Sequence, residues 1–168
     1  MTLEELDRLY LEAIAAQDDG DYAKSFPLLL RGADAGDHNA QNALGLAYDS
    51  GYGVEADKAA AIRWFKKAWR TQQESMYSNN LALTYAQIGQ RRRAHYWWKL
   101  TFSLGEDAGH GLWFAKFLLQ SKGPIDYKRI IPLVEKAANA EFHLEICEND
   151  QEEAQALLEK LRKQVTKT

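Results

Sequence analysis

Residues 40–54 read AQNALGLAYDSGYGV, and residues 57–68 read DKAAAIRWFKKA. The first stretch has the apolar spacing and small residues of a helix that packs closely on another helix, and it ends in a turn with two glycines. The second stretch begins with Asp57, a residue type that caps helix N-termini, and continues with strong helix formers. We therefore expect a helical hairpin whose two helices are joined by the turn over residues 49–57.

The composition of the whole chain favours helices over strands. Its 168 residues include 24 Ala and 21 Leu but only 3 Val, 7 Ile and 3 Pro. Ala and Leu are strong helix formers, whereas β-branched residues favour strands. The sequence therefore predicts an all-α protein.

The segment that begins at Asp57 recurs along the chain. Asp21 and Asp126 begin similar segments, and in all three a large apolar residue follows the aspartate seven positions later. A fourth copy places Trp97 where Trp64 lies. Because a period of about 32 to 37 residues is typical of helical repeat arrays, we interpret the chain as a series of helical hairpins.

A second set of helices alternates with these segments. Two of its members share the order Leu, small residue, two further residues, Tyr. The small residue allows a neighbouring helix to approach closely, and a glycine there costs about 1 kcal/mol of helix propensity relative to alanine, which indicates a packing role. The residues in this pattern are Leu44, Gly45 and Tyr48 in the first copy, and Leu81, Ala82 and Tyr85 in the second.

Stacked hairpins bury apolar faces that a single hairpin leaves exposed, so the repeats predict a solenoid. We expect one domain over residues 1–168 with about four hairpins and a C-terminal capping helix. In the capping helix, Asp150 and Glu153 have capping-box spacing. Its apolar stripe consists of Ala154, Leu157, Leu158, Leu161 and Val165. The expected hairpins cover residues 3–36, 37–73, 74–105 and 106–140, and the capping helix covers 149–166.

The two stretches quoted first, with Asp57, Lys58, Ala59, Trp64 and Lys67–Ala68, resemble the Sel1-like repeat family, which is related to tetratricopeptide repeats. The resemblance covers roughly residues 20–140. It implies a right-handed α/α solenoid whose concave face, lined by the first helix of each hairpin, binds protein.

Two repeats depart from the family pattern. In the third, Gly89-Gln90-Arg91 replaces the glycine-rich turn. In the fourth, Trp113, Phe114 and Phe117 take the places of Leu, Gly and Tyr. The curvature and the shape of the groove in that half of the chain therefore do not follow from the resemblance.

Helical geometry gives the candidate binding surface. If the Leu, small residue and Tyr face the second helix of each hairpin, residues on the opposite side of the first helix face the concave side. Asn42 and Asn79 fall at the same repeat position, where they would either form hydrogen bonds with a peptide backbone or be solvated. In both cases, replacing both residues by alanine should leave thermal stability nearly unchanged. The expected partner-binding residues are Asn39, Asn42, Leu46, Asp49, Met76, Asn79, Leu83 and Gln87.

The net charge of −3 and the pI near 5.8 give no basic footprint for nucleic acid, so we expect no nucleic-acid partner. The run Arg91-Arg92-Arg93 is interpreted as a solvated turn, with a charged rim that faces an acidic partner as the alternative. No stretch approaches the length of a membrane span, and no signal peptide is visible. Because the single cysteine, Cys147, excludes an internal disulfide, we expect a cytoplasmic protein without a membrane partner.

Catalytic and metal motifs are missing from the sequence. No HExxH, CxxC, GxSxG or P-loop pattern occurs. His143 and Cys147 would share a helix face, but two ligands fall short of a zinc site. We expect no metal, no cofactor and no catalytic residue. One aromatic cluster is interpreted as core between repeats, with a ligand box as the alternative: Tyr96, Trp97, Trp98, Trp113, Phe114 and Phe117.

These observations favour a non-catalytic module that binds a protein or peptide. Two roles remain open, a cytoplasmic adaptor and an immunity protein that neutralises a cognate toxin, a role that the resemblance to short bacterial Sel1-like proteins suggests. The acidity of the chain would suit a basic toxin. The alternative from a different class is an enzyme-like protein that binds or hydrolyses β-lactams, as the resemblance to cysteine-rich relatives suggests, although their paired cysteines are missing here.

Overall fold

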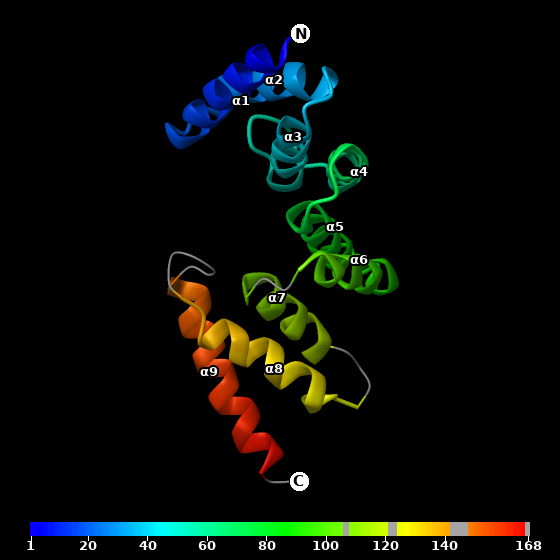
Figure 1. The fold of residues 1–168 in the computed structure, drawn as a ribbon, viewed down its shortest axis with the longest axis vertical. Coiled ribbons are helices and arrows are strands. Elements are labelled where there is room, and N and C mark those ends of the chain that lie inside the picture. Colours follow the sequence, from blue (N-terminus) through cyan, green and yellow to red (C-terminus); the bar gives the residue numbers. More distant parts are fainter. Residues whose placement is uncertain (106–107, 121–123, 142–147, 167–168) are drawn as a thin grey trace. The chain divides into compact units, whose positions relative to one another are not determined.

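The computed structural model describes residues 1–105, 108–120, 124–141 and 148–166 (Figure 1). Within these ranges it contains helices and no strand, so the prediction of an all-α protein is confirmed for them. The helices are α1 (Leu3–Asp18), α2 (Tyr22–Asp34), α3 (His38–Ser50), α4 (Lys58–Thr71), α5 (Ser75–Gln87), α6 (Arg91–Leu104), α7 (Ala108–Leu119), α8 (Tyr127–Ala138) and α9 (Glu148–Val165).

Aspartate side chains begin several of these helices, as the sequence predicted. The Asp57 carboxylate accepts hydrogen bonds from the backbone N–H groups of Ala59 and Ala60, at 2.8 and 3.0 Å, and so caps α4. Asp21 and Asp126 cap α2 and α8 in the same way. Each cap satisfies backbone donors that the first helical turn leaves without a partner.

The glycine-rich turn between α3 and α4 packs against α2. Gly53 has a φ of +72°, and a Cβ atom there would lie 2.3 Å from the carbonyl oxygen of Tyr22. The adjacent Tyr52 ring stacks on the Tyr22 ring, with 4.6 Å between centroids. The turn therefore requires glycine both for its backbone conformation and for its close approach to the preceding hairpin.

Helices α3 and α4 pack closely at Gly45. A Cβ atom on Gly45 would lie 2.5 Å from two carbon atoms of the Phe65 ring, which is fully buried. The packing role predicted for Gly45 is thus confirmed. The large core residue of α4 is Phe65, however, and Trp64, which the sequence pattern emphasised, is only half-buried. Trp98 likewise takes the core position in α6, one residue after Trp97.

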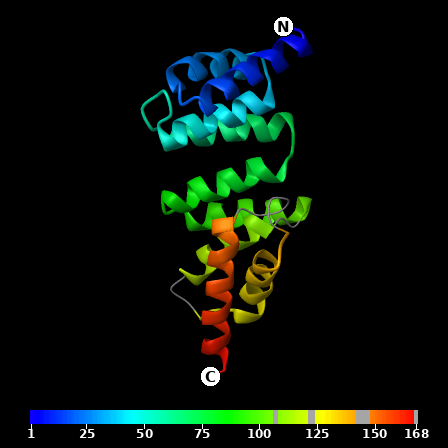
Figure 2. The same ribbon diagram turned by 90° about the vertical axis from the view of Figure 1, so that its left-hand side faces the viewer.

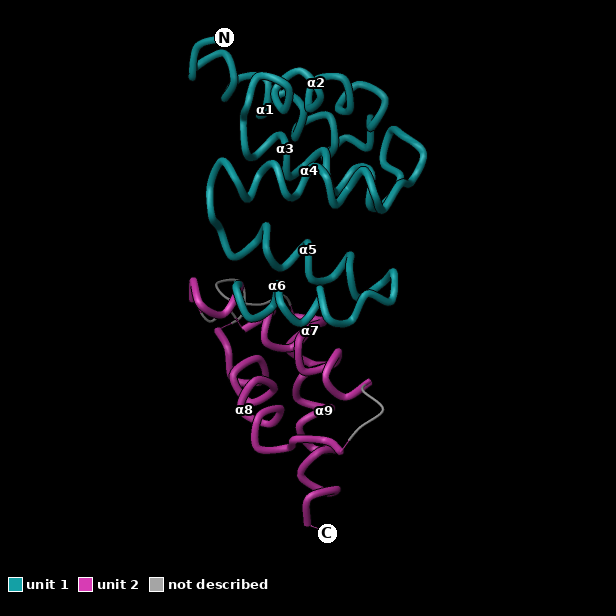
Figure 3. The backbone as a smooth tube through the Cα atoms, turned by 90° about the vertical axis from the view of Figure 1, so that its right-hand side faces the viewer, with its two compact units in different colours: residues 1–100 teal, residues 101–168 magenta. Residues whose placement is uncertain are grey.

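The chain forms two compact units, Met1–Leu100 and Thr101–Thr168, and the boundary falls within α6 (Figure 3). In the first unit each helix from α1 to α4 packs on the helix that follows it along the chain (Figure 2). In the second unit α8 packs against both α7 and α9. Packing between sequence neighbours is consistent with a helical solenoid.

The register expected for α7 was wrong by one residue. In α3 and α5 a large buried residue, Leu44 or Leu81, is followed directly by a small buried residue. In α7 the same pair of a large and a small buried residue begins at Phe114 and not at Trp113. Trp113 is exposed, and Ala115 is the small buried residue that corresponds to Gly45. The aromatic spacing in this helix was therefore a poorer guide than the position of the small residue.

The capping helix also begins earlier than expected. Because α9 starts at Glu148, Asp150 lies within its first turn and is not its cap. Glu153 pairs with Lys116 of α7, with 2.5 Å between the charged atoms. Of the predicted apolar stripe, Ala154, Leu158 and Leu161 are buried. Leu157 is half-buried, and Val165 is exposed.

None of the helices in the described ranges combines the length and the apolar character that a bilayer span requires.

Replacing Gly45 by alanine should destabilise the protein. The added methyl group gains about 1 kcal/mol of helix propensity but must displace the buried Phe65 ring, and overpacking of this kind typically costs about 1–3 kcal/mol. Urea denaturation measures the change in the free energy of unfolding. Phe65→Leu should reduce the cost of Gly45→Ala when the two are combined, because it makes room for the methyl group.

The matched control is Gly111→Ala in α7. Its Cβ would meet the Leu133 carbonyl oxygen at 3.4 Å, an ordinary contact, so this variant should be neutral or more stable by up to about 1 kcal/mol. Equal effects of Gly45→Ala and Gly111→Ala would contradict the role given to the Gly45–Phe65 contact.

Candidate functional site

Side chains of α3 and α5 form a row of hydrogen bonds, which we call the α3–α5 seam. In its middle, Asn80 Nδ2 donates to Asn42 Oδ1 at 2.9 Å. Four residues further along α5, Thr84 Oγ1 donates to Asp49 Oδ1 near the end of α3, also at 2.9 Å. These bonds join the first helices of two successive predicted hairpins.

At the N-terminal ends of the two helices, the seam is built around Tyr77. Its hydroxyl lies 2.7 Å from His38 Nδ1 and donates to Asn39 Oδ1 at 3.1 Å. Burial raises the pKa of the Tyr77 phenol above its usual value, and the carboxylates of Glu74 and Asp37 add to the rise. The fold therefore favours the neutral hydroxyl, which can donate and accept at once.

At the opposite end, Lys58 closes the seam. Its ammonium group lies 3.0 Å from Asp49 Oδ2 and donates to the Asp49 carbonyl at 2.9 Å. The same group donates to Gln87 Oε1 at 2.6 Å. A residue at the start of α4 thus links the last turns of α3 and α5.

The eight predicted partner-binding residues fall into two groups. Five of them have polar side chains that are engaged in hydrogen bonds: Asn39, Asn42, Asp49, Asn79 and Gln87. Three are apolar: Leu46 and Met76 are each 42% exposed, and Leu83 is half-buried.

The expected exposure of Asn42 and Asn79 was wrong. They are only 5% and 6% exposed, and both side chains accept hydrogen bonds within the fold. Asn42 accepts from Asn80, and Asn79 accepts from the indole N–H of Trp98 at 3.1 Å, so that it faces α6. Both amides are therefore structural, and their removal should affect stability, contrary to the expectation from sequence.

The residues with which α5 meets α3 differ from those that the sequence pattern predicted. Tyr77, Asn80, Thr84 and Gln87 lie at intervals of three and four residues and form one stripe of the helix. The expected stripe included Gln87 but was otherwise one residue out of register. A stripe of hydrogen-bonding residues with helical spacing is the signal that would have found them.

Leu46 and Met76 are exposed apolar side chains that lie four residues from the seam residues Asn42 and Asn80. They belong to α3 and α5, the two helices that the seam joins, and each is 42% exposed. The seam holds these two helices in a fixed relation. Exposed apolar side chains beside a hydrogen-bonded frame are one arrangement from which a protein interface can be built.

The aromatic cluster expected to form core is partly core. Trp98, Phe114 and Phe117 are buried, whereas Tyr96 and Trp113 are 57% and 41% exposed. No group of three or more potential metal ligands occurs among the described residues. His143 and Cys147, the pair considered from sequence, lie outside the described residues.

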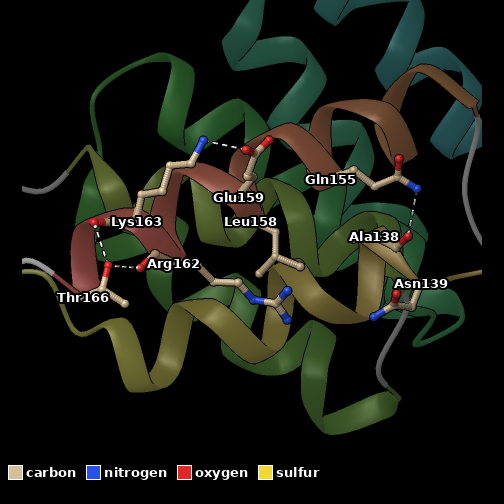
Figure 4. Close-up of a pocket in the computed structure, with 8 residues that line it drawn as sticks. All are labelled: Ala138, Asn139, Gln155, Leu158, Glu159, Arg162, Lys163 and Thr166. Carbon is tan, nitrogen blue, oxygen red and sulfur yellow. Dashed lines mark hydrogen bonds and ion pairs between the residues drawn. The ribbon is translucent and has the colours of Figure 1, made fainter.

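A shallow depression of about 530 Å³ lies between α8 and α9 (Figure 4). Its polar groups are engaged with one another: Gln155 donates to the Ala138 carbonyl, and Lys163 pairs with Glu159. Arg162 pairs with Glu135 on α8 at 2.8 Å. The bonds of Gln155 and Arg162 join the last two helices, so we assign the depression a role in packing.

Comparison with known proteins gives no relative. No protein-family model matches the chain, and no curated protein matches it closely enough to count as related.

Replacing Asn42 and Asn79 by alanine should lower the free energy of unfolding. Each substitution removes the acceptor of a buried or half-buried donor, a loss that typically costs about 1–3 kcal/mol. Urea denaturation measures the effect, and Asn149→Ala, at an exposed position in α9, is the control. If the double variant unfolds at the same urea concentration as the control, these two bonds do not stabilise the fold.

Stability should also depend on the ionisation of Tyr77. Because the fold raises this pKa, the neutral phenol contributes fully below the ordinary tyrosine pKa of about 10, and its contribution falls as the pH rises above that value. Tyr77→Phe should be less stable at neutral pH, since it loses its bonds to His38 and Asn39, but should lose less stability in alkali.

Urea denaturation at a series of pH values from about 8 to 11 measures both slopes. Tyr96→Phe, which alters an exposed hydroxyl, should behave as the wild type. Parallel pH profiles for wild type and Tyr77→Phe would contradict this assignment.

Proposed function

We propose that this chain is a non-catalytic binding protein that holds a protein or peptide partner on the surface formed by α3 and α5. The observation that carries the proposal is the pair of exposed apolar side chains, Leu46 and Met76, beside the α3–α5 seam. The other contacts of the partner on this surface would be with Leu83 and with the exposed side chain of Gln87.

We further propose that the architecture is a right-handed solenoid of about four Sel1-like hairpins with α9 as the cap. Three features support this assignment. The Gly45–Phe65 contact and the glycine-rich turn on α2 occur where the repeat pattern places small residues. Helices that are neighbours in sequence also pack on one another within each unit.

A solenoid of this size would act as an adaptor or as an immunity protein in the cytoplasm. The single cysteine is in keeping with a reducing compartment. The product of the neighbouring gene distinguishes the two roles. If that product is toxic and this protein confers immunity, co-expression of the two should restore growth. An adaptor would instead bind several partners weakly.

Affinity capture from the native host, followed by mass spectrometry, should identify the partner. Calorimetry with the purified partner then measures the effect of Leu46→Gln combined with Met76→Gln. A central interface residue typically contributes more than about 1 kcal/mol, so the double variant should weaken binding by at least about tenfold.

The control combines Ile125→Gln with Val165→Gln, which alters two apolar residues of similar exposure that lie in the second unit, outside α3 and α5. It should bind as the wild type does. The proposal fails if the Leu46 and Met76 variant binds as tightly as this control.

A further inference from the structure

Positive charge is concentrated in one part of the chain. Between residues 58 and 104 there are nine Lys and Arg residues and a single acidic residue, Glu74. This segment therefore has a net charge of +8, and the remainder of the chain must have −11 to give the total of −3. The low net charge of the whole molecule conceals a strongly basic region.

The basic side chains of α4 form a regular stripe. Arg63, Lys67 and Arg70 are exposed and lie at positions i, i+4 and i+7 of the helix. They extend about 10 Å along the helix axis, with one charge per turn. Arg63 lies 3.9 Å from Asp57, and α4 itself contains no acidic residue.

The basic region continues from α4 to α6 within the first unit. Lys66 of α4 and Arg93 of α6 both approach the ring of Tyr85, at 5.7 and 5.6 Å from its centroid. Trp69 and Trp97 meet edge to face at 5.5 Å and join the same two helices. At the start of α6, an open hollow of about 420 Å³ is lined by residues 89–93, which include three arginines.

Most aromatic rings of this region are poorly placed to stack on nucleic-acid bases, although Tyr96 of α6 is 57% exposed. Lys67 covers the ring of Trp64 at 3.7 Å, and Tyr85 is buried. Trp69 and Trp97 pack on each other. Proteins that bind single strands offer successive free ring faces, so the arrangement favours carboxylates over bases as the bound groups.

We propose that α4 and the first turns of α6 form a second interaction surface, which binds an acidic helix of a partner protein. A helix with Glu or Asp at positions i, i+4 and i+7 presents carboxylates at the same spacing as the α4 stripe, and arginine binds carboxylates in a two-pronged geometry. This surface is distinct from the one on α3 and α5, so each can fail its test without the other.

The probe is a fluorescein-labelled, alanine-rich helical peptide with glutamates at i, i+4 and i+7, and binding is measured by fluorescence anisotropy. The variant Arg63→Gln, Lys67→Gln and Arg70→Gln should lose affinity about tenfold or more, and added salt should weaken wild-type binding. The control variant changes three exposed basic residues elsewhere by the same net charge, and should bind within about twofold of wild type. These are Arg31→Gln, Lys128→Gln and Lys160→Gln.

Acetylation of the wild-type protein provides a readout that requires no variant. The peptide should protect Lys66 and Lys67 of α4 from modification, as measured by mass spectrometry, and leave Lys128 and Lys160 reactive. Equal protection of all four lysines would overturn the proposal.

An oligothymidylate with the same number of negative charges tests the nucleic-acid alternative. The acidic peptide should bind more tightly than the oligonucleotide. Tighter binding of the oligonucleotide, lost in the α4 variant, would assign the surface to nucleic acid. Equal losses in the α4 and control variants would show that overall charge alone drives binding.

Discussion

The close approach of α3 and α4 at Gly45 sets the geometry on which the first unit depends. Only a residue without a Cβ allows the Phe65 ring to lie against the α3 backbone at this distance. Phe65 then fills the space between the helices, and the glycine-rich turn that joins them can reach back onto α2 at Tyr22. One residue without a side chain thus connects the packing of a hairpin with the packing of its neighbour.

The α3–α5 seam and the exposed side chains of Leu46 and Met76 belong to the same two helices. Asn42, Asp49 and Tyr77 use their polar groups to hold α3 and α5 together, so that few of these groups are left to bond a peptide. The partner would instead be bound through Leu46 and Met76, whose apolar side chains are already partly exposed. An interface of this kind gains affinity because its frame is ordered before the partner arrives.

The sequence predicted the helices, their aspartate caps and the reason for Gly45, because these depend on local chemistry and on the repeat period. It predicted the sides of helices less well: Trp113 and Asn79 were each assigned to the wrong surroundings. A helix turns by 100° per residue, so an error of one position moves a side chain to another face. The basic region across α4 and α6 was missed because a sum over the whole chain cancels opposite charges.

The central claim is that α3 packs on α4 through Gly45 and is tied to α5 through the seam. Nuclear Overhauser spectroscopy on isotope-labelled protein tests it most directly. We predict cross-peaks between the Gly45 Hα protons and the Phe65 ring, and between the side-chain amide of Asn80 and the protons of Asn42. A folded, helical protein that gives neither cross-peak would contradict the account.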